Sequence, residues 1–238
     1  MQGARPGAGT TLRPGLYTGR SFAGLRIGLL GGSFNPAHAA HRHISLVALR
    51  RLGLDQVWWL VSPQNPLKPT HGMAAFADRF ASAVGVARHP RIIVTGLERA
   101  LGTRFTSDTL AALRGRYPRT RFVWLMGADN LGQIHRWQRW RSIFETIPVA
   151  VFDRPPYRRR TLNGPAAQAY RSFRVVESRA RGLVDHRAPA WTFFASRLDP
   201  LSSTQIRLKA QNPSVRPVAN DLEPSHLQPR DHQRRGIR

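Results

Sequence analysis

The sequence predicts an α/β fold in which a mostly parallel sheet carries helices on both faces. Its length of 238 residues fits one such domain with a sizeable core. Residues 25–49 contain an apolar run, a glycine pair and a helical pattern in that order, which indicates a strand, a turn and a helix. Residues 56–61 are apolar throughout, as in a parallel strand that is covered on both faces.

Strands and helices alternate along the rest of the chain. The first helix spans about residues 39–51, and apolar positions at helical spacing predict another within residues 73–88. Residues 153–189 are rich in Arg, Pro and Gly, so we expect an irregular basic surface excursion with one helix near residues 165–172. The predicted strands cover residues 25–30, 56–61, 91–94, 121–126, 147–152 and 191–195.

Composition limits the class of protein. There is no cysteine, which excludes disulfides and thiolate metal sites. The net charge is +24, from 37 basic and 13 acidic residues, but the arginines are spread along the chain. We therefore expect an anionic substrate and not nucleic acid as the physiological partner. No apolar run is long enough to span a membrane and none suits a signal peptide, so we expect a cytoplasmic protein.

Three regions follow from these patterns. Residues 1–24 are rich in Gly, Pro, Arg and Thr and predict a flexible basic leader. Residues 25–222 form the folded domain, and residues 223–238 form a polar basic tail. The sequence does not predict the oligomeric state.

The first turn is the most informative segment. Residues 31–41 read GGSFNPAHAAH between the first strand and the first helix. Glycines allow a sharp turn and the close approach of an anion, and Pro36 favours the first turn of a helix. The free N–H groups there attract phosphate. His38 and His41 are three residues apart and share a helix face, so both can donate to charge that develops at this site.

Other segments after strands carry candidate ligands, each with a plainer interpretation. Lys68, in a proline-rich loop, can neutralise phosphate or be a surface lysine. Thr106 begins a helix that can bind an anion or only be capped. Asp129 can accept hydrogen bonds from ribose, help to hold hydrated Mg²⁺, or cap a helix. Trp137 offers an aromatic face to a ring or packs in the core. The helix start LSSTQIR at residues 201–207 suits a polyphosphate or an ordinary cap.

Residues 31–41 resemble the signature of the nucleotidyltransferases that carry an H-x-G-H motif. The family pattern is G-G-[S/T]-F-[D/N]-P-x-H-x-G-H, and this chain departs from it only at Ala40, where the family has Gly. Alanine is the smallest replacement, so we expect slight crowding and retained function. Nine specified positions behind a strand are more selective than a pair of histidines alone.

Over about residues 25–222 the chain resembles the bacterial nicotinate-nucleotide adenylyltransferases. The matching segments are 31–41, 62–68, 127–140 and 202–207. The most selective is MGADNL followed by H-x-W-x-x-W, which separates this family from pantetheine-phosphate adenylyltransferases and cytidylyltransferases. The resemblance implies a Rossmann-like nucleotidyltransferase fold.

The resemblance also implies a reaction. Nicotinate mononucleotide and ATP, with Mg²⁺ as the cofactor, would give nicotinate adenine dinucleotide and pyrophosphate, a step of NAD biosynthesis. The mononucleotide phosphate would attack the α-phosphorus of ATP directly, without a covalent enzyme intermediate. Catalysis would then be mainly positioning and charge neutralisation. We expect no protein cluster dedicated to the metal, whose ligands would be mostly phosphate oxygens and water.

The resemblance assigns roles by motif position. The implied catalytic residues are His38, His41, Lys68 and Arg207. The implied ATP-binding residues are Gly31, Gly32, Ser33, Phe34, Gly127, Asp129, Ser203 and Thr204. The implied nicotinate mononucleotide-binding residues are Asn65, Thr106, Trp137 and Gln138. Trp137 would stack on the pyridine ring, while Thr106 and the backbone N–H of Gln138 would bind the nicotinate carboxylate. Related sequences often have an aromatic residue at position 138, which leaves the choice between nicotinate and nicotinamide open.

Two other functions stay open on the sequence. One is a sister enzyme of the same fold that adenylylates or cytidylylates another phosphate, which the Trp137 segment disfavours. The other is a basic, non-catalytic protein that binds nucleic acid on a degenerate nucleotidyltransferase fold. The four implied catalytic residues are intact, which disfavours that second alternative.

Overall fold

The computed structural model describes residues 22–63, 72–153 and 161–195. The tail and residues 1–21 of the predicted leader lie outside these ranges. Phe22, which the sequence assigns to the leader, is buried and packs edge-on against Trp58 with ring centroids 4.9 Å apart. Five of the implied site residues also lie outside the described residues, namely Asn65, Lys68, Ser203, Thr204 and Arg207.

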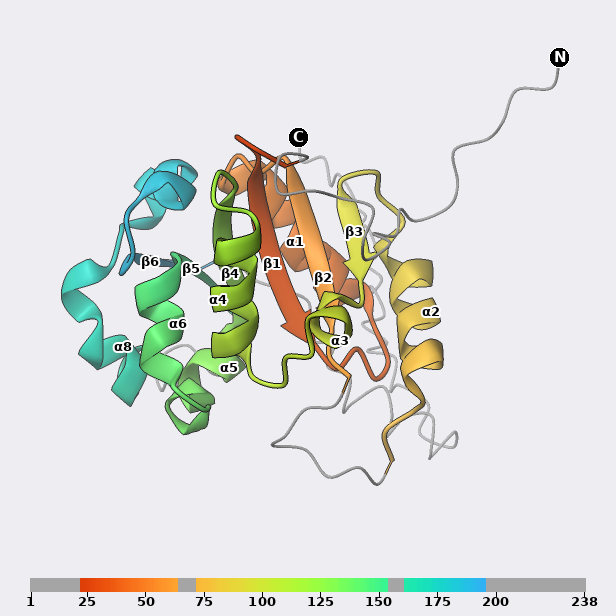
Figure 1. Cartoon of the computed structure of the whole chain (residues 1–238). Helices are drawn as coiled ribbons and strands as arrows, with labels where there is room; N and C mark the ends of the chain where they lie inside the picture. The colour runs from red at the N-terminus through yellow and green to blue at the C-terminus, as the bar shows by residue number, and fades with distance from the viewer. Residues whose placement is uncertain (1–21, 64–71, 154–160, 196–238) are drawn as a thin grey trace, which may run out of the picture.

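Six parallel strands form one sheet in the order β3-β2-β1-β4-β5-β6 (Figure 1). The chain adds β2 and β3 on one side of β1 and then adds β4, β5 and β6 on the other side. This order is that of a Rossmann-like sheet and confirms the predicted fold class. The strands are β1 Arg26–Gly32, β2 Gln56–Val61, β3 Ile92–Thr95, β4 Arg121–Gly127, β5 Val149–Phe152 and β6 Trp191–Phe194.

Helices cover both faces of the sheet, with α1 behind it and α4 and α6 in front in Figure 1. The longer helices are α1 Ala39–Arg51, α2 Phe76–Ala87, α4 Thr106–Arg116 and α6 Trp140–Thr146. The shorter α-helices are α3 Leu97–Leu101, α5 Ala128–Gln133 and α8 Pro165–Ala169. The 3-10 helices are η1 Ile134–Arg136, η2 Arg171–Phe173 and η3 Glu177–Asp185.

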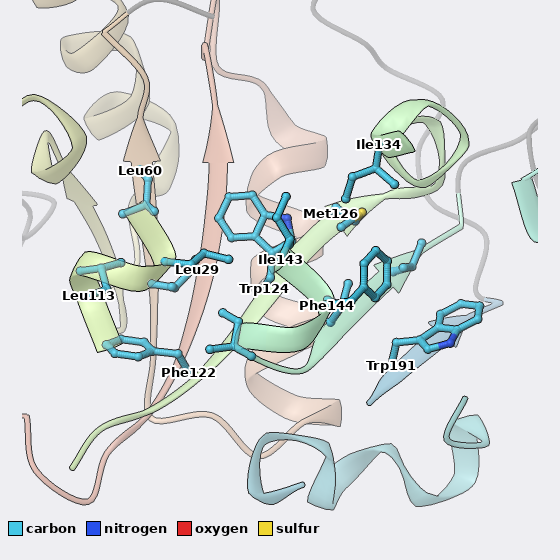
Figure 2. Packing of buried hydrophobic residues seen from close by; sticks show 14 of the residues in the cluster. Leu29, Leu60, Leu113, Phe122, Trp124, Met126, Ile134, Ile143, Phe144 and Trp191 are labelled. Atoms are coloured by element: carbon cyan, nitrogen blue, oxygen red, sulfur yellow. The ribbon is translucent and has the colours of Figure 1, made fainter. Parts of the chain in front are cut away.

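The strands are mainly apolar, and their successive side chains enter two different cores. In β2, Trp58 packs with the helices on the front face, whereas Trp59 packs with α1 and α2 on the opposite face. Figure 2 shows the front core, where Leu113 of α4 and Ile143 of α6 lie among the side chains of the strands.

The first strand is longer than predicted, which changes the role of its glycines. β1 continues through Gly31 and Gly32, which pair with β2, so the turn begins only at Ser33. A Cβ atom at Gly31 would lie 2.4 Å from the Trp124 ring, so glycine is required there by close packing and not by the turn. Pro36 precedes α1, which begins at residue 39, and is therefore not in its first turn.

The predicted surface excursion is instead a packed part of the domain. Within its described residues, η3 places Leu183 and Val184 in the core beside α1, and Tyr170 stacks on Phe144 at 4.6 Å. The apolar residues come in short runs among many arginines, which hides their periodicity in the sequence. Among the described residues, no helix has both the length and the apolar character needed to cross a bilayer.

Candidate functional site

The candidate site lies at the carboxyl edge of the sheet, between β1 and β4. The strand order reverses there, and in open α/β sheets this switch point is where ligands bind. The turn from β1 into α1, the end of β2 and the start of α5 after β4 all reach this edge. The sequence-predicted residues that the structure describes come from these segments and from the starts of α4 and α6.

The turn after β1 is built around Phe34, not around a glycine. Phe34 has a φ of 47°, in the left-handed region that favours glycine, and its side chain is buried. Its ring stacks on Trp59 at 5.0 Å and lies 4.8 Å from the His41 ring. Packing of the aromatic ring thus holds a backbone conformation that costs free energy.

His38 and His41 lie together, as predicted, with ring centroids 3.9 Å apart. His38 is the N-cap of α1 and His41 the third helical residue, so they share the helix start and not a face of the helix proper. The backbone N–H of His38 donates to Nδ1 of His41 at 3.2 Å. A neutral His41 therefore carries its proton on Nε2, which makes Nε2 a hydrogen-bond donor.

The segment after β4 brings a glycine and a carboxylate together. Gly127 is the N-cap of α5, and Asp129 lies in the first turn of that helix. A Cβ atom at Gly127 would lie 2.4 Å from Oδ1 of Asp129, so only glycine leaves room for this carboxylate position. Acidic side chains are favourable at a helix N-terminus, which fits Asp129.

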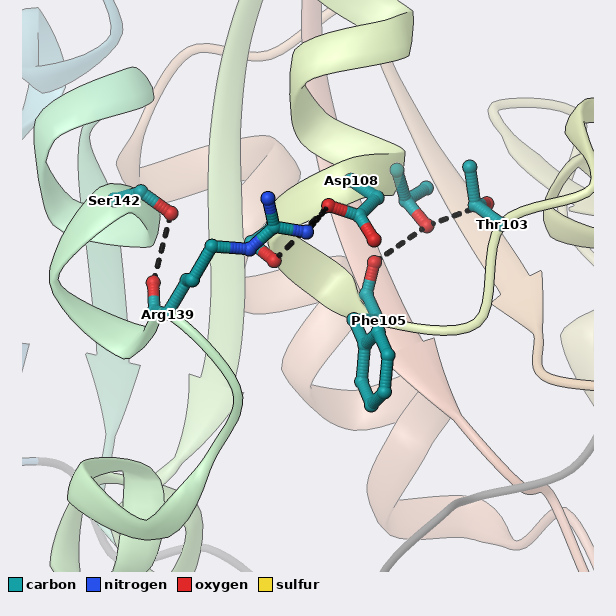
Figure 3. Close-up of polar contacts among 7 residues, drawn as sticks. Thr103, Phe105, Asp108, Arg139 and Ser142 are labelled. Carbon is teal, nitrogen blue, oxygen red and sulfur yellow. Dashed lines mark hydrogen bonds and ion pairs between the residues drawn. The ribbon is translucent and has the colours of Figure 1, made fainter.

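Two segments that are distant in sequence meet on the front face of the sheet. Thr106 is the first residue of α4, as predicted, and the N-cap is Phe105, so Thr106 does not cap this helix itself. Trp137 is half-buried against the front core, and Gln138 is exposed. An ion pair between Arg139 and Asp108 joins the Trp137 segment to the start of α4 (Figure 3). The two groups implied in nicotinate binding therefore come from linked segments.

The sequence did not indicate that two ionisable residues near this edge are buried. Glu98 of α3 makes hydrogen bonds with the side chains of Ser62 and Thr109. Burial raises the pKa of Glu98 to about 7, and these two hydrogen bonds oppose the rise. Arg79 of α2 is 2% exposed and donates to backbone carbonyls at the ends of β1 and β2. Each is a single charged residue within a helical pattern, so the sequence contains no signal for its burial.

The described residues contain no cluster of three or more His, Cys, Asp or Glu side chains that could hold a metal ion. Histidine donors and helix N-termini predominate where these segments meet. Such an arrangement suits a strongly anionic ligand.

A family model and several relatives match most of this chain. The model of the cytidylyltransferase-like family matches residues 29–209. A probable nicotinate-nucleotide adenylyltransferase of Bradyrhizobium sp. (strain ORS 278) is 56% identical over 183 residues, which cover 77% of this chain and 95% of the relative. One from Cereibacter sphaeroides is 56% identical over 181 residues, which cover 76% of this chain and 95% of the relative.

A solved structure shares the fold at lower sequence identity. The Plasmodium falciparum nicotinic acid mononucleotide adenylyltransferase complexed with NaAD aligns with a TM-score of 0.54 and 15% identity. The alignment covers 77% of this chain and 83% of that chain.

Proposed function

The chain belongs to the nicotinate-nucleotide adenylyltransferases within the cytidylyltransferase-like family. We therefore propose that its site binds ATP and nicotinate mononucleotide and joins them by adenylyl transfer. It is an enzyme of NAD biosynthesis that transfers the adenylyl group of ATP to nicotinate mononucleotide and releases pyrophosphate. The main support for this conclusion is the 56% identity to the Bradyrhizobium relative over 77% of this chain. The alternatives of a sister enzyme and of a non-catalytic protein have no comparable support.

The turn from β1 into α1 would bind the triphosphate. His38 and His41 would donate hydrogen bonds to phosphate oxygens at the start of α1, where the helix dipole also favours negative charge. The backbone of Gly31, Ser33 and Phe34 would contact the nucleotide. The proton on Nε2 of His41 supports its role as the donor to the charge that develops at the α-phosphorus.

The reaction itself needs no nucleophile from the protein. The mononucleotide phosphate would attack the α-phosphorus in line as the bond to pyrophosphate breaks. Two anions must approach each other, so positioning and charge neutralisation lower the barrier. Mg²⁺, held mainly by phosphate oxygens and water, would neutralise the polyphosphate when bound. His41 would stabilise the extra negative charge of the transition state.

The rest of the site would hold the two nucleosides. Gly127 and Asp129 would lie by the ribose of ATP. Trp137 would stack on the pyridine ring, while Thr106 and the backbone N–H of Gln138 would bind the nicotinate carboxylate. The ion pair between α4 and the Trp137 segment supports this pairing of groups.

Six further residues have roles that rest on motif position alone. Gly32 belongs with the ATP-binding turn, and Asn65 with the mononucleotide. Lys68 and Arg207 would hold the β- and γ-phosphates, with Ser203 and Thr204 at a helix start beside them.

A pair of histidine variants on α1 tests the proposed chemistry. We expect His41→Ala to lower the turnover of pyrophosphate release by about 100-fold or more, as loss of a donor to the transition state does. His43→Ala is the matched control, because His43 is an exposed histidine of the same helix. Both variants should keep the wild-type circular dichroism spectrum. A near-wild-type rate in His41→Ala would remove His41 from the mechanism.

A further inference from the structure

We propose that Arg79 of α2 is a positioning residue for the triphosphate end of the site: its buried guanidinium fixes the turn after β1 against the end of β2. The proposal rests on the proposed function for the identity of the ligand that is positioned. Arg79 itself contacts no reacting atom. It would act through the backbone of the two segments that it joins.

The guanidinium uses all three of its nitrogens on backbone carbonyls. Nη1 donates to the carbonyl of Ser33 at 2.6 Å and to that of Ser62 at 2.8 Å. Nη2 donates to the carbonyl of Pro63 at 2.8 Å, and Nε donates to that of Ala74 at 3.0 Å. These carbonyls belong to the β1–α1 turn, the segment after β2 and the entry to α2. One side chain therefore sets the relative position of three segments at the carboxyl edge of the sheet.

The position of α2 makes this arrangement possible. α2 begins at the carboxyl edge of the sheet, beyond the ends of β2 and β3 (Figure 1). Asn35 adds a second connection to the same entry segment, because its side chain donates to the carbonyl of Gly72 at 3.0 Å and accepts from the N–H of Ala74 at 3.2 Å. The β1–α1 turn is thus attached to the start of α2 on both sides of Phe34.

The bond to Ser33 bears directly on the histidines. The Ser33 carbonyl belongs to the peptide that leads into Phe34, whose φ is 47°. The Phe34 ring lies 4.8 Å from the His41 ring, so a shift of that peptide moves the surface against which His41 is placed. A misplacement of about 1 Å at a reacting group can cost about 100-fold in rate.

The charge of Arg79 adds an electrostatic contribution. Its acceptors are neutral carbonyls, and the ion pairs within the described residues involve other arginines. Burial lowers the pKa of Arg79, but a guanidinium stays protonated in proteins. A positive charge therefore lies behind the turn that would bind the triphosphate, where salt screens it less than at the surface.

Steady-state kinetics of two Arg79 variants test this proposal. Arg79→Met removes the charge and every hydrogen bond, whereas Arg79→Lys keeps a cation that cannot reach all four carbonyls. We expect both variants, assayed well below their melting temperatures, to lower kcat/KM for ATP, by about 100-fold in Arg79→Met. We expect KM for nicotinate mononucleotide to stay at the wild-type value in both variants.

Arg99→Met is the matched control. The guanidinium carbons of Arg79 and Arg99 each lie 5.6 Å from the centre of the Phe76 ring, but Arg99 is exposed and contacts none of these carbonyls. Its kinetics should match the wild type. If Arg79→Met does not fold, Arg79→Lys carries the test with the same criteria.

The outcomes separate a positioning role from a structural one. Folded Arg79 variants with wild-type kinetics for ATP would overturn the proposal. So would a lower kcat with both KM values unchanged if the folded fraction, measured by circular dichroism, falls by the same factor. If the wild-type protein transfers no adenylyl group, the proposed function fails instead. The calorimetric affinity for ATP, expected to be weaker in both Arg79 variants, then still tests the positioning of the turn.

Discussion

The buried carboxyl group of Glu98 makes the stability of the protein depend on pH in an unusual direction. Burial raises its pKa from the ordinary 4.5 to about 7, so the folded state binds the proton more tightly than the unfolded chain. Between these values the unfolded chain has lost the proton while the folded protein keeps it. This contribution to stability is complete below about pH 4.5 and is lost as the pH rises through about 7.

Glu98→Gln should remove this dependence, because glutamine is nearly the same shape and stays neutral. A pKa raised from 4.5 to about 7 corresponds to about 3 kcal/mol. We therefore expect the free energy of unfolding of the variant, relative to the wild type, to rise by about 3 kcal/mol between about pH 4.5 and about pH 8. Urea denaturation at both pH values measures this difference.

The comparison between the two proteins cancels groups that titrate equally in both. Asp78→Asn, in the exposed first turn of α2, controls for the loss of one negative charge. A relative stability of Glu98→Gln that does not change with pH would show that Glu98 titrates normally. It would also refute the inference that the carboxyl between Ser62 and Thr109 is desolvated.

Two further substitutions test the packing and the pyridine end of the site. Gly31→Ala should lower stability by about 1–3 kcal/mol in urea denaturation, because the new methyl group would lie 2.4 Å from the Trp124 ring. Gly85→Ala, where a Cβ meets nothing within 4 Å, should instead stabilise α2, and equal effects of the two would contradict the packing. Trp137→Ala should raise KM for nicotinate mononucleotide by about 10-fold with an unchanged KM for ATP, since stacking acts on one substrate only. A raised KM for ATP alone would place Trp137 at the other nucleotide.

The sequence predicted the sheet well because parallel strands are apolar on both faces. The predicted bounds of α1 and β2 are confirmed at both ends. The observed ends of the other strands differ from the predicted ends by at most two residues. β1 ends later than predicted because Gly31 and Gly32 continue its pairing with β2. The glycine pair indicated a turn, and nothing in the local sequence shows this pairing.

The features that the sequence did not predict depend on contacts between distant segments. Phe34 adopts a positive φ because Trp59 and Arg79 hold it, and neither is its neighbour in sequence. The buried charges of Arg79 and Glu98 depend on partners more than ten residues away. Residues 170–184 bury apolar side chains that stand in short runs among arginines, so their burial appears only in the fold.

The site was predicted from sequence motifs and not from the apolar pattern of the strands. The pair of His38 and His41 was found from a motif with nine specified positions, and the structure places their rings 3.9 Å apart. The roles assigned to Thr106, Trp137 and Gln138 stay predictions. The arrangement of α4 and the Trp137 segment supports them.

The rate at which pyrophosphate is released from ATP in the presence of Mg²⁺, compared between nicotinate mononucleotide and nicotinamide mononucleotide, tests both the adenylyl transfer and the carboxylate pocket. We predict rapid release with the acid and slow release with the amide, because Thr106 and the N–H of Gln138 would donate to a carboxylate. Equal rates with both substrates would contradict the carboxylate pocket while leaving adenylyl transfer intact. No release with either would contradict the proposed function.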